Sequence, residues 1–140
     1  MTPVLIDTGC IVALLDRSAR QHRQCVEAIS SLDAPLITCE AVITECCYLV
    51  RNLAGAQSAI LDNVDRGVFL VPYRLAGNAA AVSKLMDKYA DVPMAFADAC
   101  LVHMADTFKT GRVLTLDRDF AIYRWQRNRR FDMFLQMGAA

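Results

Sequence analysis

The feature that most constrains the fold of this chain is a regular alternation of short apolar runs with longer stretches of helical periodicity. The apolar runs are predicted to be buried strands, at residues 4–6, 36–38, 68–71, 113–115 and 131–135. Strands that alternate with helical crossovers form parallel sheets covered by helices on both faces. The sequence therefore predicts an α/β fold.

The stretches between the predicted strands have the spacing and the end signals of helices. We expect helices at about 10–16, 20–32, 40–53, 56–66, 76–90 and from Pro93 to about 108, followed by a basic helix at about 118–126. Gly55 separates two of these helices, and Gly67 ends the second of them. The length of 140 residues fits one domain with one core. We predict that this domain covers 1–135 and that 136–140 form a loose tail.

The composition excludes a disordered chain and a membrane-spanning one. Apolar residues make up 55% of the sequence, but no run approaches the roughly 20 residues of a membrane span. The N-terminus lacks the pattern of a signal peptide, so we expect a cytoplasmic protein. The apolar share is high for a small domain and favours a partner or a second copy that covers part of the surface. Without a CxxC pair, we expect the six cysteines to be reduced and mostly buried.

Two aspartates follow predicted strands. Asp7 comes after the first strand, and Asp117 comes after the strand at 113–115. Ligands bind outside the carboxyl ends of strands in open parallel sheets, so both acids fall at the expected functional edge. The alternatives are that Asp7 caps the next helix and that Asp117 is a turn residue. Asp119 is the better candidate for capping the basic helix.

Two further acids interrupt apolar helices. Glu45 is the only charged residue between 41 and 50, and Tyr48 and Leu49 lie one helical turn away. Asp98 has the apolar stripe of its own helix at i+3, i+4 and i+7, which places it on the inward face if the helix begins near Pro93. A buried acid without a partner is unfavourable. The alternatives are an ion pair with a distant arginine for Glu45 and a helix cap for Asp98.

Together the four acids favour a site for a hard divalent cation. Carboxylates gathered at one place repel one another unless a cation neutralises them. Oxygen ligands favour Mg²⁺ or Mn²⁺, and Ca²⁺ is possible. His22 and His103 have no cysteine or acid at metal-ligand spacing, so we read them as packed or exposed residues.

Four segments in order resemble the motifs of PIN-domain nucleases. They are Val-Leu-Ile-Asp-Thr-Gly at 4–9, Thr-Glu-Cys-Cys-Tyr-Leu at 44–49, Met-Ala-Phe-Ala-Asp-Ala at 94–99 and Val-Leu-Thr-Leu-Asp-Arg-Asp-Phe at 113–120. The resemblance spans nearly the whole chain and includes all four acids. The single-domain length resembles that of VapC-type toxins of toxin–antitoxin pairs. The segment at 51–75 is less regular.

The resemblance implies a five-stranded parallel sheet and a metal-dependent endoribonuclease. By that resemblance Asp7, Glu45, Asp98 and Asp117 would hold Mg²⁺ or Mn²⁺. Thr8 and Thr115 would place hydroxyl groups near the metal, and Asp119 would assist. We expect in-line attack by a water that the metal activates, with products that carry 5′-phosphate and 3′-hydroxyl ends. The implied partners are RNA, an antitoxin protein and a second copy of the chain.

The net charge of zero hides a basic C-terminal third. Six arginines lie between residues 112 and 130, and Arg112, Arg118, Arg124 and Arg127 are our candidates for contacts with RNA phosphates. Tyr123 and Trp125 lie among them, either stacking on bases or, as we favour for Trp125, packed in the core or an interface. A solvated basic surface is the alternative for the arginines.

Four other functions are considered. A phosphatase of the haloacid-dehalogenase type needs a second aspartate two residues after the first, where this chain has Gly9. A receiver domain needs paired acids near its N-terminus and a later lysine, a distribution that is not found here. A catalytically silent PIN-like binding module and a PIN-domain nuclease that processes RNA without being a toxin remain as alternatives.

Overall fold

The centre of the molecule is one parallel β-sheet. The structure is a computed structural model and describes residues 2–134. Five strands pair in the order β3-β2-β1-β4-β7, and every pairing is parallel. The strands are β1 (Val4–Ile6), β2 (Leu36–Ile37), β3 (Phe69–Leu70), β4 (Arg112–Leu114) and β7 (Asp132–Met133). The predicted α/β fold with a five-stranded parallel sheet is confirmed.

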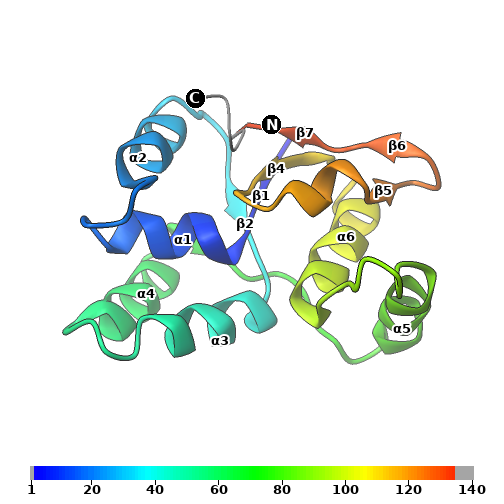
Figure 1. The fold of residues 1–140 in the computed structure, drawn as a ribbon, viewed down its shortest axis with the longest axis horizontal. Helices are drawn as coiled ribbons and strands as arrows, with labels where there is room; N and C mark the ends of the chain where they lie inside the picture. The colour runs from blue at the N-terminus through cyan, green and yellow to red at the C-terminus, as the bar shows by residue number, and fades with distance from the viewer. Residues whose placement is uncertain (1, 135–140) are drawn as a thin grey trace.

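Six α-helices connect these strands. They are α1 (Thr8–Leu15), α2 (His22–Ser30), α3 (Glu40–Leu49), α4 (Ala56–Asp65), α5 (Ala79–Lys88) and α6 (Phe96–Phe108). Figure 1 shows α1, α2 and α4 on one side of the strands, and α5 and α6 on the other. Within the described residues, no helix has the length and apolar character needed to cross a membrane.

The strand order makes the chain change direction at the middle of the sheet. From β1 the chain moves outward to β2 and β3, and it then returns to β4 on the other side of β1. Right-handed crossovers therefore put the helices that follow β1 and β2 on one face and those that follow β3 on the other. The ends of β1 and β4 diverge at this point, which is where parallel sheets bind ligands.

The core is apolar and is built around the central strand of the sheet. Every residue of β1 is fully buried, which explains its uninterrupted Val-Leu-Ile sequence. All six cysteines are free thiols, and only Cys47 is partly exposed. The prediction that the cysteines are mostly buried is therefore confirmed, and they fill the core as small hydrophobic residues.

The predicted basic helix at 118–126 is wrong. A short 3₁₀ helix, η1 (Arg118–Ala121), is followed by an antiparallel hairpin of β5 (Arg124–Trp125) and β6 (Arg129–Arg130). Tyr123 and Trp125 point inward on either side of the partly exposed Arg124, which is the alternation of a strand. The Trp125 Nε1–H donates to the carbonyl of Arg130 at 3.2 Å, which ties the two strands together.

Helix α6 begins later than predicted. Pro93 disfavours helical conformation in the residue before it, and the amides of Val92 and Met94 both donate to the carbonyl of Tyr89, so the segment forms a turn. Asp98 is therefore in the first turn of α6 and not in its interior. The predicted last strand begins one residue late, at Asp132. The predicted tail at 136–140 lies outside the described residues.

Candidate metal centre

Asp7 stands at the junction of β1 and α1. Its Oδ1 accepts a hydrogen bond from the backbone amide of Thr8 at 2.7 Å, so the helix cap considered from the sequence is present. Its Oδ2 accepts a hydrogen bond from the Thr115 hydroxyl at 2.8 Å. Asp7 is buried, and these two bonds fix the orientation of its carboxylate.

Asp117 is held in a similar way at the end of β4. The Asp117 amide donates to the Thr115 hydroxyl at 3.0 Å, and the Asp117 carboxylate accepts from the Asp119 amide at 2.9 Å. Thr115 thus links the two strand ends, because its hydroxyl donates to Asp7 and accepts from the backbone of Asp117. The hydroxyl predicted at position 115 therefore positions two of the acids.

Asp98 reaches the same place from the opposite side. It lies in the first turn of α6, with its side chain buried. Its Oδ2 accepts a hydrogen bond from the Tyr123 hydroxyl at 3.3 Å. The stripe predicted at i+3, i+4 and i+7, which is Leu101, Val102 and Ala105, is fully buried, so the inward orientation of Asp98 is as expected.

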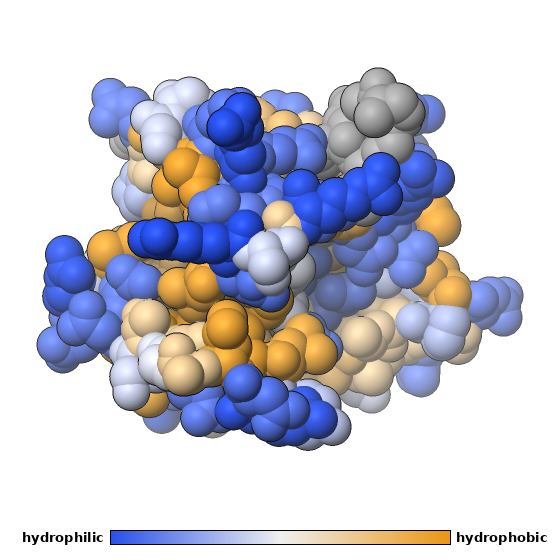
Figure 2. All heavy atoms as spheres, turned by 60° about the vertical axis from the view of Figure 1, so that its left-hand side comes forward, coloured by the Kyte–Doolittle hydropathy of each residue, from blue (hydrophilic) through white to orange (hydrophobic). Residues whose placement is uncertain are grey.

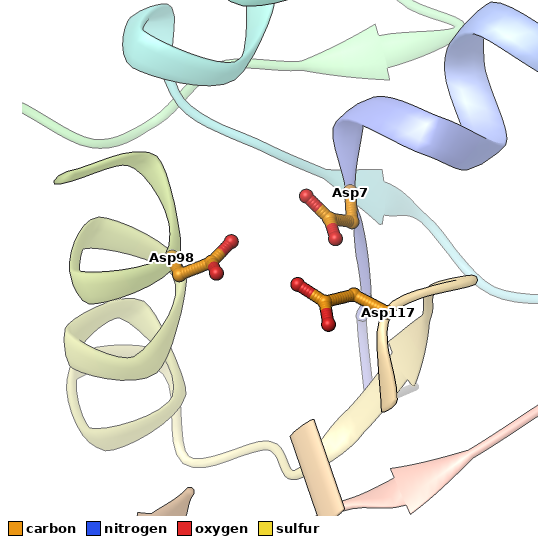
Figure 3. Close-up of side chains that lie close together, drawn as sticks. All are labelled: Asp7, Asp98 and Asp117. Carbon is orange, nitrogen blue, oxygen red and sulfur yellow. The ribbon is translucent and has the colours of Figure 1, made fainter. Parts of the chain in front are cut away.

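The three aspartates point toward one another. One carboxylate oxygen from each of Asp7, Asp98 and Asp117 lies within 4.8 Å of the other two. Figure 3 shows these side chains converging from β1, α6 and the end of β4. They open into a hollow of about 370 Å³ that Thr8, Gly9, Glu45, Leu49, Ala95 and Leu116 also line.

Burial and mutual repulsion favour the protonated form of two of these acids. The pKa of Asp7 is raised to about 6, mainly by burial and further by the charges of Asp117 and Glu45, against the lowering effect of its two hydrogen bonds. Burial, followed by the charges of Asp7 and Asp117, raises the pKa of Asp98 to about 8. Without a cation, this cluster cannot hold its full negative charge near neutral pH.

Glu45 occupies a different position from the one expected. The sequence predicted a buried acid, but Glu45 is exposed on α3. Its apolar neighbours Tyr48 and Leu49 are themselves 62% and 54% exposed, so that side of the helix is not packed. Glu45 lines the rim of the hollow, and its charge contributes to the raised pKa of Asp98. It is outside the group of three converging acids.

The two remaining predicted residues of the site differ in their surroundings. The Thr8 hydroxyl oxygen is buried and has no hydrogen-bond partner within the described residues. Such an orphaned oxygen next to the carboxylates is consistent with a ligand or ordered water that completes the site. Asp119 contributes its backbone amide to Asp117 and is only partly exposed.

The donor set fits a hard divalent cation. The converging atoms are all carboxylate oxygens, which Mg²⁺ and Mn²⁺ prefer over nitrogen or sulfur ligands. Among the described residues, this is the only group of three acidic, histidine or cysteine side chains arranged to hold a metal.

The candidate RNA-binding arginines do not share one location. Arg118 is next to Asp117, whereas Arg112 begins β4 at the other end of the sheet. Arg124 donates from Nη1 to the carbonyls of Ala121, Ile122 and Tyr123, so it caps η1. Arg127 is exposed in the loop of the β5–β6 hairpin.

The two aromatic residues of this segment are buried. Tyr123 is fully buried and Trp125 is 6% exposed, so neither ring offers a free face for stacking on a base. The packed position that we favoured for Trp125 is therefore confirmed. Tyr123 is the residue that the sequence analysis missed, because nothing in its sequence spacing shows that it contacts Asp98.

The chain resembles known proteins in sequence and in fold. Residues 4–126 match the PIN domain family. The chain is 31% identical over 117 residues to a protein of Mycobacterium tuberculosis named ribonuclease VapC26, covering 82% of this chain and 87% of that protein. The crystal structure of VapC20 from the same organism, described as a toxin that cleaves the sarcin–ricin loop, superposes with a TM-score of 0.80 at 18% identity. The superposition covers 90% of this chain and 98% of VapC20.

The family match covers all four acids found from the sequence, and the similarity to VapC26 extends over most of both chains. The fold, the order of the motifs and the convergence of the three aspartates agree with these matches. The chain therefore belongs to the PIN-domain family and is a distant homologue of the VapC ribonuclease toxins.

Proposed function

We propose that this protein is a divalent-metal-dependent endoribonuclease. The observation that carries the proposal is the convergence of Asp7, Asp98 and Asp117 at the point where the strand order reverses. The relationship to a protein named as a ribonuclease supports RNA as the substrate class. Hydrolysis of a phosphodiester needs charge neutralisation at phosphorus, and this chain has no histidine in the hollow to serve as a base.

We assign each residue of the hollow a role from its position. Asp7 and Asp98 would hold the cation from two sides, and Asp117 would complete the set from the end of β4. When bound, Mg²⁺ or Mn²⁺ would acidify a water, polarise the phosphate and stabilise the leaving oxygen. Glu45 lines the rim of the hollow and is solvent-exposed, a position from which it would orient the attacking water. Thr115 keeps Asp7 and Asp117 in register.

Incubation with labelled single-stranded RNA tests this proposal. The purified chain should cleave RNA with Mg²⁺ or Mn²⁺ and not with EDTA, leaving 5′-phosphate and 3′-hydroxyl ends. Asp98→Asn should lower the rate by at least about 100-fold, on the scale of losing one preorganised electrostatic contact. Asp62→Asn is the matched control, because Asp62 pairs with Arg66 on the exposed side of α4. Equal cleavage by wild type and D98N would contradict the proposal.

We further propose that the protein is the toxin of a toxin–antitoxin pair and acts as a homodimer. Its relatives carry VapC names, and VapC20 is described as a toxin. The exposed apolar residues on and after α3 and on α4 are Tyr48, Leu49, Leu53 and Leu61. Figure 2 shows hydrophobic side chains gathered low on the face where these helices lie. A surface of this kind suits a second copy and an antitoxin segment.

Induced expression in cells distinguishes a toxin from a nuclease that processes RNA. Wild type should arrest growth, D98N should not, and co-expression of a small neighbouring gene should restore growth. If RNA is cleaved in the test tube but growth continues, the protein is a PIN-domain nuclease of another role. If RNA is bound but not cleaved with any divalent cation, it is a binding module.

A further inference from the structure

A basic pocket lies at the end of the sheet away from the carboxylates. Its lining includes Thr2, which precedes β1, Arg112, which begins β4, and Asp132, which begins β7. Asp7 and Asp117 come after the carboxyl ends of β1 and β4, which are the opposite ends of these strands, and Asp98 on α6 lies close to both. In Figure 1 the β5–β6 hairpin stands at the end of the sheet where the chain begins, whereas α1 and α3 start at the other end.

The pocket has an excess of positive charge. Its cations are Lys109, Arg112, Arg129 and Arg130, and Asp132 is its only acid, which gives a formal charge of +3. None of the four cations forms an ion pair with an acid of residues 2–134. The uncompensated charge gives the pocket a positive potential that favours an anion.

The guanidinium groups of Arg129 and Arg112 contact the surrounding structure. Arg129 stacks over the ring of Trp125 with Cζ 4.3 Å from the ring centroid, and Arg112 donates from Nη1 to the carbonyl of Thr2 at 3.3 Å. Trp125 packs against Gly111 so closely that a side chain at position 111 would overlap the indole. Arg129 also donates from Nη1 to the Gln126 Oε1 at 3.3 Å. A guanidinium has five N–H donors, so the stacked Arg129 still has donors for phosphate oxygens.

We propose that Lys109, Arg112, Arg129 and Arg130 form a phosphate-binding pocket that holds the backbone of the RNA substrate remote from the carboxylates. Arg112 and Asp117 are separated by four residues, so their Cα atoms lie at most about 17 Å apart. A single strand reaches both only if it extends beyond the scissile bond by several nucleotides. Trp125 and Tyr123 are buried, so neither ring stacks on a base of this RNA.

The proposal rests on RNA being the substrate, so its test measures binding without cleavage. Fluorescence anisotropy in EDTA compares a labelled RNA of about 20 nucleotides with one of about 4 nucleotides over a range of salt concentrations. The variant is R129Q/R130Q, since both side chains are exposed, and the substitution keeps the Arg130 carbonyl to which the Trp125 Nε1–H donates. The matched control is R20Q/R23Q, which removes the same charge from the region of α2.

We expect R129Q/R130Q to weaken binding of the long RNA by at least about tenfold and to reduce the salt slope by about 1.4, the value for two lost phosphate contacts on a single strand. R20Q/R23Q should change neither the affinity nor the salt slope. R129Q/R130Q should weaken binding of the short RNA less than binding of the long RNA. R129K/R130K keeps the charge and should restore most of the salt slope. An equal loss of affinity for the long RNA in R129Q/R130Q and in R20Q/R23Q would overturn the proposal. Tight binding of polyglutamate at the same pocket would also overturn it. Absent cleavage with this binding pattern intact would contradict only the nuclease activity.

Discussion

Thr115 is the residue on which the geometry of the centre depends most directly. Its hydroxyl donates to Asp7 and accepts from the amide of Asp117, so one side chain sets the spacing of two carboxylates. We expect Thr115→Val to lower the affinity for Mn²⁺ by about 10- to 100-fold, as loss of an outer-shell partner does. Thr115→Ser keeps the hydroxyl and should retain most of the affinity. Titration calorimetry measures the affinity of each protein for Mn²⁺. Equal affinity in the wild type and both variants would show that the hydrogen bonds of the Thr115 hydroxyl do not position the acids.

Protonation of Asp7 and Asp98 sets the pH dependence of stability without metal. Their pKa values are raised to about 6 and about 8, against an ordinary value near 4, so the folded protein binds protons that the unfolded chain has released. The stabilising contribution is complete below about pH 4 and is lost as pH rises through 6 and then 8. The Tm in EDTA should therefore fall relative to that of D98N between pH 6 and pH 8.5. A constant difference in Tm would contradict the raised pKa of Asp98.

Cation binding reverses this trend, because the cation competes with these protons. The increase in Tm caused by Mn²⁺ should therefore be larger at pH 8.5 than at pH 6.

The sequence predicted the aspartates of the centre better than the glutamate. Asp7 and Asp117 follow strands, and the direction of a strand determines which edge of a sheet its end reaches. Glu45 was assigned to a buried face because its helical neighbours are apolar. Tyr48 and Leu49 are nevertheless exposed, and whether an apolar helix face is covered depends on tertiary or quaternary contacts. The contact of Tyr123 with Asp98 joins residues distant in sequence, which periodicity cannot reveal.

The β5–β6 hairpin depends on a glycine in the loop before β4. At Gly111 an added Cβ would overlap the indole of Trp125, so Gly111→Ala should displace the hairpin and reduce the free energy of unfolding by about 1–3 kcal/mol. At Gly9, within α1, the nearest atom to an added Cβ is 3.7 Å away on Leu116. Gly9→Ala should therefore stabilise the protein by about 0.5–1 kcal/mol. Urea unfolding of both variants checks the two signs, and a neutral Gly111→Ala would contradict the close packing.

The β5–β6 hairpin could not be predicted from the sequence. Strands β1 to β4 were located because each is a short apolar run between helical segments. The segment 118–126 was assigned to a helix although its inward side chains, Tyr123 and Trp125, alternate with the partly exposed Arg124. Alternation over so few residues is not distinguishable from a helical pattern until the packing partner, here Gly111, is known.

At the scale of the whole molecule, the apolar surface near α3 and α4 predicts self-association. Leu53 and Leu61 are 39% and 55% exposed, and we expect the wild type to be a dimer by light scattering. Leu53→Lys combined with Leu61→Lys should weaken the dimer by at least about tenfold, because burial of unpaired ammonium groups is unfavourable. Ile122→Lys, which alters an equally exposed residue after η1, is the control. A monomeric wild type would rule out this role of the surface.

The fold as a whole serves to bring three carboxylates from distant parts of the chain to one point. β1, β4 and α6 each contribute one aspartate, and the reversal of strand order leaves the opening between them. The central claim is that these three side chains form one divalent-cation site. Calorimetric titration of the purified protein with Mn²⁺ at pH 8.5 tests it most directly, with Asp7→Asn, Asp98→Asn and Asp117→Asn beside the surface control Asp62→Asn. We predict that wild type and D62N bind Mn²⁺ alike and that each of the other three variants binds at least about tenfold more weakly. Undiminished binding by those variants, or no binding by the wild type, would contradict the claim.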